Sequence, residues 1–171
     1  MQETIITRLN LKKGKERPIL QGHHWIYSGA IGSKNPPTDE GMAEVYSAGG
    51  EKLGLAFLNG KHSIAAHMVA FGGESLEEAL RARIRMAVSL RRSWFNPQET
   101  NAFRLINAEG DGIPGLVVDS YAGVLVVQIS HPGLEKIKDL LVALLIEETA
   151  PRIPIITSLS TRFRAHPSEV K

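Results

Sequence analysis

The sequence predicts an α+β protein, in which a compact β-barrel precedes a small α/β domain with a mostly antiparallel sheet and two helices. Short strand-forming runs separated by turn dipeptides fill the first part of the chain. A capped stretch with helical periodicity then begins at Ser75. Further strand patterns and one apolar helix follow it. We therefore divide the chain into domains at residues 1–72 and 73–171, with the boundary near Gly72 and Gly73.

The first domain is expected to hold several short strands and one short helix. Its strands are predicted at residues 4–9, 23–31, 43–47, 52–58 and 63–71, with turns at 48–51 and 59–61. A helical turn is predicted at 19–22, after the basic segment 11–18. Short strands at this spacing with one small helix are typical of a compact barrel.

The second domain is expected to begin with a long helix. Ser75 and Glu78 have the spacing of a capping box, and the helical period continues to Trp94 before Pro97 ends it. Strands are predicted at 103–107, 116–121, 124–130 and 153–158, and a second helix at 134–148. The buried stripe of that second helix is predicted to contain Leu134, Ile137, Leu140, Leu141, Leu144 and Leu145.

A glycine-rich corner joins two strands of this domain within RLINAEGDGIPGLVVDSY, residues 104–121. Gly112 and Gly115 are expected to supply positive φ angles there. A calcium loop is excluded because its twelfth position falls on Val118, which has no carboxylate. A phosphate or dinucleotide loop is disfavoured because no helix follows the glycines. Turn chemistry therefore favours a structural corner.

Two stretches carry a family resemblance. Residues 104–121, continuing into GVLVVQIS, resemble the central domain of bacterial large-subunit rRNA methyltransferases that make 5-methylcytosine, the RlmI-like group. The stretch LKKGKERPILQGHHWIYSGAI is similar to the PUA domain of that family. At the far end, LSTRFR resembles the Ser-Asp-x-x-x-Arg segment that leads into the family's catalytic domain, with Thr161 in place of Asp.

The resemblance implies RNA recognition and positioning, as the non-catalytic N-terminal half of an rRNA methyltransferase that uses S-adenosylmethionine. The expected partner is RNA, in particular rRNA. The C-terminal Rossmann-like methyltransferase domain is expected to be absent, so the chain is either a shortened natural protein or a fragment. The alternative function is a protein-interaction module without RNA binding, in which the central domain forms a homodimer.

Composition narrows the other possibilities. The net charge of +2 permits an anionic partner without requiring one. The sequence has no cysteine, which excludes disulfides and thiolate metal sites and is compatible with a cytoplasmic location. No apolar run reaches membrane-spanning length, so we expect neither a membrane partner nor, given the RNA resemblance, DNA.

The candidate RNA-binding residues form two groups. The first is a basic segment beside the aromatic-rich residues 23–27, where Trp25 or Tyr27 could stack on a base. Composition alone favours a solvated basic loop beside core aromatics, whereas the PUA resemblance favours RNA contact. We expect Trp25 to lie in the core. The second group lies on the first long helix, and pairing with Glu77 and Glu78 is an equal alternative for it. The candidates are Lys12, Lys13, Lys15, Arg17, His23, Arg81 and Arg85.

No catalytic residue and no metal site are predicted. His23 and His24 are strand neighbours that point to opposite faces, so they cannot chelate one ion together. The carboxylates of Glu109, Asp111 and Asp119 have no nucleophile near them in sequence, and a structural hydrogen bond is expected for Asp119. No cofactor is expected in this chain, because the glycine-rich turn that would hold S-adenosylmethionine is missing.

Overall fold

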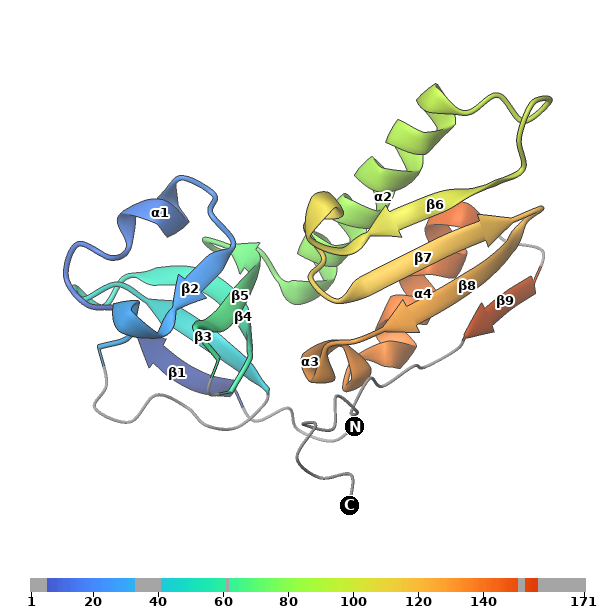
Figure 1. Cartoon of the computed structure of the whole chain (residues 1–171). Coiled ribbons are helices and arrows are strands. Elements are labelled where there is room, and N and C mark those ends of the chain that lie inside the picture. The colour runs from blue at the N-terminus through green and yellow to red at the C-terminus, as the bar shows by residue number, and fades with distance from the viewer. Residues whose placement is uncertain (1–5, 33–40, 61, 151–152, 157–171) are drawn as a thin grey trace, which may run out of the picture.

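A computed structural model describes residues 6–32, 41–60, 62–150 and 153–156, and shows two sheets side by side (Figure 1). The first sheet has the strand order β1-β3-β4-β5-β2. Its strands are β1 (Ile6–Asn10), β2 (Trp25–Tyr27), β3 (Met42–Tyr46), β4 (Lys52–Leu58) and β5 (Ile64–Phe71). The pair β1–β3 is parallel, and the other pairs are antiparallel. A short helix, α1 (Arg17–Leu20), lies between β1 and β2.

This first sheet curls without closing into a barrel. Its two outer strands, β1 and β2, continue into Leu11 and Ile31, which form one isolated antiparallel bridge. The predicted strand 23–31 is correspondingly too long. The strand itself covers only Trp25–Tyr27, and a 3-10 turn, η1 (Ser28–Ala30), separates it from the extended residue Ile31. The α+β class is confirmed, with an open curled sheet in place of a closed barrel.

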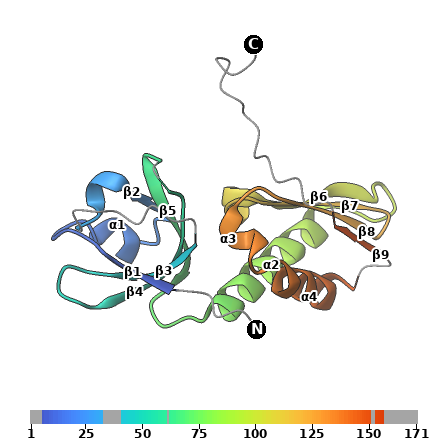
Figure 2. The same cartoon turned by 90° about the horizontal axis from the view of Figure 1, so that it is seen from below.

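The second sheet has the order β6-β7-β8-β9. Its strands are β6 (Ala102–Asn107), β7 (Leu116–Tyr121), β8 (Val124–Ile129) and β9 (Ile153–Ile156). Only β8–β9 is parallel, so the expectation of a mostly antiparallel sheet holds. Figure 2 shows that α2 (Leu76–Trp94) and α4 (Lys138–Thr149) cover one face of it.

The two long helices were predicted with different accuracy. Helix α2 has the expected capping box, in which Ser75 accepts from the Glu78 N–H and the Glu78 carboxylate accepts from the Ser75 N–H. The second predicted helix is divided into α3 (Pro132–Glu135) and α4, with non-helical angles at Ile137. The division has a packing reason, because α3 lies against β4 of the first sheet, where a side chain at Gly133 would overlap the Phe57 ring.

The buried apolar residues form two clusters, one inside the first sheet and one shared by both sheets. One face of β4 and β5 packs inside the first sheet, through residues such as Ala56 and Met68. Their other face joins α2, α4 and the second sheet, and Phe57 and Val69 belong to that cluster. Strands buried on both faces read as continuous apolar runs, as LGLAFL and IAAHMVA do here. This shared core fixes the first sheet against the corner of the second.

Candidate nucleic-acid interface

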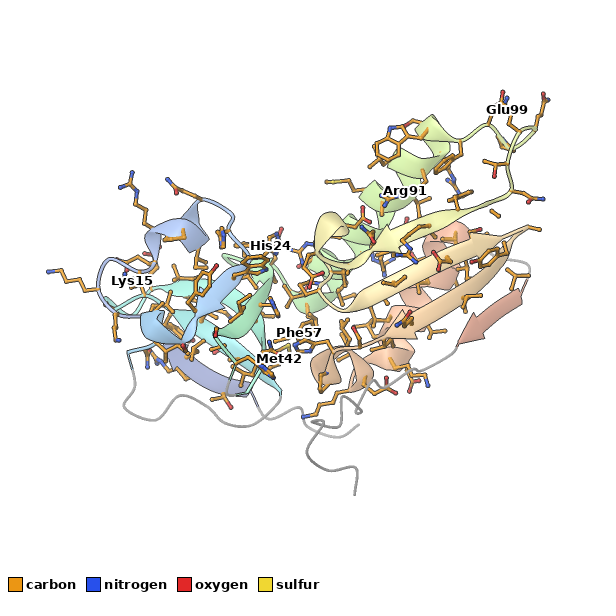
Figure 3. All side chains as sticks on the ribbon, in the orientation of Figure 1. Lys15, His24, Met42, Phe57, Arg91 and Glu99 are labelled. Carbon is orange, nitrogen blue, oxygen red and sulfur yellow. The ribbon has the colours of Figure 1, made fainter. Side chains whose placement is uncertain are left out.

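The basic segment lies on the surface of the first sheet, away from the second. Lys12, Lys13, Lys15 and Arg17 are all exposed. A turn closed by the Lys15 N–H on the Lys12 carbonyl positions three of them, and Figure 3 shows Lys15 extended away from the sheet. The Lys12 ammonium donates to the Gly29 carbonyl at 2.9 Å. Within the described ranges, none of the four cations pairs with a carboxylate, so their charges remain available to an anionic ligand.

The arginines of α2 are placed differently. Arg85 makes a two-pronged contact with Glu148 of α4, at 2.7 and 3.0 Å. Arg81 pairs with Glu77 at 2.9 Å and also with Glu147. The hydrogen bonds that these guanidinium groups donate to the carboxylates raise the pKa of both arginines. The two arginines therefore join α2 to α4, and a phosphate would have to compete with carboxylates that already hold them.

A buried ion pair holds the glycine-rich corner, and the sequence analysis missed it. Arg91 is 8% exposed and binds both carboxylate oxygens of Asp111, at 2.5 and 2.7 Å. The same carboxylate accepts from the Asn107 N–H at 2.6 Å, and Arg91 also donates to the Arg104 carbonyl. The available signal was the position of Arg91, which continues the buried series Ile84, Ala87 and Val88 along α2. An arginine on the buried face of a helix requires a buried partner.

The corner itself has the predicted backbone. Gly112 and Gly115 have φ angles of 73° and 81°, so both expected positive values are confirmed. A 3-10 turn, η2 (Ala108–Asp111), leads into them. A Cβ at Gly112 would lie 3.1 Å from the Arg83 side chain and 3.7 Å from His24 Cε1. The missing side chain therefore lets the corner approach the residues that precede β2.

A pocket of about 270 Å³ lies where these two segments meet. Its walls are contributed by residues 22–25 on one side and by Glu109 and Pro114 of the corner on the other. His24 stands on the side of the first sheet that faces the second (Figure 3), and its Nδ1 donates to the Met68 carbonyl at 3.0 Å. The Glu109 carboxylate is exposed and pairs with no other described side chain by a hydrogen bond or salt bridge, although its negative charge acts on nearby His67. The pocket thus combines one free carboxylate with two imidazoles and an indole.

Trp25 is not a core residue, contrary to the expectation from the sequence. Its side chain is 38% exposed, and it makes edge contacts with His23 and Tyr27 at 5.8 and 6.4 Å between ring centroids. Ile26, which is 2% exposed, takes the inward position on β2 instead. Strand alternation therefore places His23, Trp25 and Tyr27 together on the outer side of an edge strand.

Two buried histidines lie at the junction of the sheets. His67 of β5 and His131, the N-cap of α3, are 8% and 7% exposed, with ring centroids 6.0 Å apart. Burial lowers the pKa of His131 to about 4 and also lowers the pKa of His67. His131 Nδ1 accepts from the Gly133 N–H, while its Nε2 has no partner among the described residues. This pair is built to stay neutral.

The remaining candidates are structural or outside the described residues. Asp119 accepts from Arg104 at 2.9 Å, which confirms the structural bond expected for it. In the described part of the chain, no three His, Asp or Glu side chains form a group that could hold a metal ion. No described helix combines the length and apolarity needed to cross a bilayer. The LSTRFR segment lies outside the described residues.

Comparison with known proteins gives concordant results. A PUA-like domain family matches residues 9–71. The chain is 34% identical over 143 residues to the ribosomal RNA large subunit methyltransferase I of Shewanella frigidimarina, covering 81% of this chain and 36% of that protein. It is 36% identical over 135 residues to the protein of the same name from Aeromonas salmonicida, covering 77% and 34%. The chain thus spans about a third of the length of these curated relatives.

Solved structures show the same fold. A chain from Streptococcus mutans, assigned to the SAM-dependent methyltransferases, superposes with a TM-score of 0.72 over 88% of this chain and 41% of its own length. A second chain, assigned as a methyltransferase and complexed with SAH, gives the same TM-score over 40% of its length. Both are 19% identical to this chain, so they establish the arrangement of the two sheets and nothing about ligands.

Proposed function

Because this chain belongs, over about four fifths of its length, to the ribosomal RNA large subunit methyltransferase I family, we propose that it recognises RNA, with rRNA as the substrate class. It positions that RNA for methyl transfer, and the chemistry resides in the part of the relatives that the match does not cover. The observation that carries the proposal is the set of four exposed cations at residues 12–17, none of which pairs with a carboxylate of a described residue, followed along the chain by exposed aromatic rings. Cations hold phosphates, and aromatic rings stack on unpaired bases.

The residues present do not fit S-adenosylmethionine. In the described part, Gly72 and Gly73 stand between a strand and a long helix, as a cofactor loop would require. The N-terminus of that helix is already occupied, because the side chain of Ser75 accepts from the Glu78 N–H and the Glu78 carboxylate accepts from the Ser75 N–H. In this role the chain binds and orients RNA with its own cations and rings.

The test is the salt dependence of RNA binding. Replacing Lys12, Lys13 and Lys15 together by alanine should flatten the slope of log K against log salt by about two to three, since each phosphate contact contributes roughly 0.7–0.9. The fold should persist, because exposed lysines contribute little to stability. Lys52→Ala is the matched control, since its ammonium already pairs with Glu44 at 2.6 Å. An unchanged slope in the triple variant would remove these lysines from the interface.

A second candidate function, self-association, is favoured by one surface feature. Met86, Leu90 and Trp94 follow one another at intervals of four along α2 and are 70%, 37% and 65% exposed. Residues four apart share one helix face, so the three form an apolar row. We propose this row as the contact if two copies associate. Sedimentation equilibrium of the wild type and of Trp94→Ser would test it, and a monomer at high protein concentration would refute it.

A further inference from the structure

The pocket at the junction of the sheets has a chemistry more specific than general RNA affinity. We infer that it receives a single unpaired guanine base, held by the Glu109 carboxylate beside Trp25. The inference rests on the proposed RNA binding and names the base that this site selects. The size of the pocket, the hydrogen-bonding groups on its walls and the exposed rings beside it all favour such a base.

The size and position suit one base. At about 270 Å³ the pocket falls just below the roughly 300–1,000 Å³ of sites for drug-sized ligands. It therefore fits one planar ring system rather than a whole dinucleotide. Its rim continues into the row of His23, Trp25 and Tyr27 on the edge strand β2. An unpaired base can enter beside Trp25, and a neighbouring base can rest on the exposed ring of Tyr27.

The hydrogen-bonding groups follow from the contacts of the two histidines. His24 Nδ1 donates to a carbonyl, so its Nε2 is an acceptor in the neutral ring. His23 Nδ1 accepts from the Trp25 N–H at 3.1 Å, so its Nε2 carries the proton. With the free carboxylate of Glu109, the walls supply acceptors from two residues and a donor from one. A ligand for this pocket must bring neighbouring donors together with an acceptor.

Guanine meets this requirement and the other bases do not. Its Watson–Crick edge presents the N1–H and the N2 amino group side by side, next to the O6 acceptor. Two parallel donors match two carboxylate oxygens, as a guanidinium does in fork-shaped pairs. Adenine and cytosine place a ring-nitrogen acceptor beside their amino group, which a carboxylate repels. Uracil flanks its single N–H with two carbonyls.

The probes are three RNA hairpins that share a stem and a four-nucleotide loop. The loop carries guanine, inosine or adenine at one position and uracil at the others. Inosine keeps N1–H and O6 and lacks only the N2 amino group. Binding of the full chain is measured by fluorescence anisotropy at one fixed salt concentration. The wild type should prefer guanine over inosine by roughly 5- to 150-fold, the discrimination typical of one bidentate base contact.

The variants separate this inference from the proposed function. Glu109→Gln should bind the guanine and inosine hairpins about equally, because an amide cannot accept two hydrogen bonds side by side. Glu51→Gln, an exposed glutamate on the turn between β3 and β4, should keep the wild-type preference. In a Trp94→Phe background Trp25 is the remaining tryptophan, and the guanine hairpin should quench its fluorescence.

Three outcomes would contradict the guanine site. Equal, salt-dependent binding of all three hairpins by the wild type would overturn the guanine site while leaving general RNA binding intact. No binding of any hairpin, even at low salt, would remove the proposed function and the guanine site with it. A guanine preference that persists in Glu109→Gln would show that another group reads the base, and would also overturn the assignment.

Discussion

Acid should destabilise this protein through its buried histidine pair. The pKa of His131 is about 4 in the folded protein and about 6.5 in an unfolded chain, because the folded site excludes the water that would solvate the charge. As the pH falls below 6.5, the unfolded chain takes up a proton that the folded protein refuses. The contribution of neutral His131 to the free energy of unfolding is therefore fully present above pH 6.5 and is lost between pH 6.5 and 4.

The magnitude follows from the two pKa values. At about 1.4 kcal/mol per pKa unit, full protonation of His131 costs about 3 kcal/mol, and roughly 2 kcal/mol of that is already lost at pH 5. His67 adds to the loss in the same direction, since burial lowers its pKa too. Urea unfolding followed by circular dichroism at pH 7.5, 6.5, 5.5 and 5.0 would measure the effect.

His131→Asn separates titration from packing. Asparagine can still cap α3 by accepting from the Gly133 N–H, as His131 does, but it has no proton to gain in this range. The variant should have a lower free energy of unfolding than the wild type at pH 7.5, because it loses the ring contact with Phe57. It should lose less of that stability on acidification. His62→Asn, at an exposed histidine, should leave the pH profile unchanged. Equal losses of unfolding free energy between pH 7.5 and 5.0 in His131→Asn and in the wild type would refute the reasoning.

Three further outcomes are expected. Gly14 and Gly115 share a φ angle of 81°, but a Cβ meets nothing within 4 Å at Gly14 and lies 2.6 Å from His131 Cβ at Gly115. In thermal unfolding, alanine should cost about 1–2 kcal/mol at Gly14 and clearly more at Gly115; equal costs would contradict the close packing of the corner. Arg91→Met should destabilise by about 3–5 kcal/mol, because it leaves the Asp111 carboxylate buried without its partner, and the double variant with Asp111→Asn should recover part of that loss in urea unfolding. Isothermal titration with S-adenosylmethionine should give no stoichiometric micromolar binding to this chain, and a clear one-to-one isotherm would overturn the view that no described turn fits the cofactor.

The sequence determined those features that depend on neighbours along the chain. The capping box of α2 needs only Ser75 and Glu78 three positions apart, and the corner angles need only glycine at positions 112 and 115. Strand patterns located β4, β6 and β7 within a residue or so, because alternation and turn dipeptides act over a few residues.

The tertiary structure decided what depends on residues far apart in sequence. The break between α3 and α4 follows from the packing of α3 on Phe57, more than 70 positions earlier. Ile26 rather than Trp25 enters the core because β2 pairs with the distant strand β5 in the register Ile26–Ala66. The Arg91–Asp111 pair and the pocket that joins residues 22–25 to Glu109 also arise from such contacts. Local periodicity predicts which side of a helix or strand is apolar, but packing across the shared core decides which other element that side contacts.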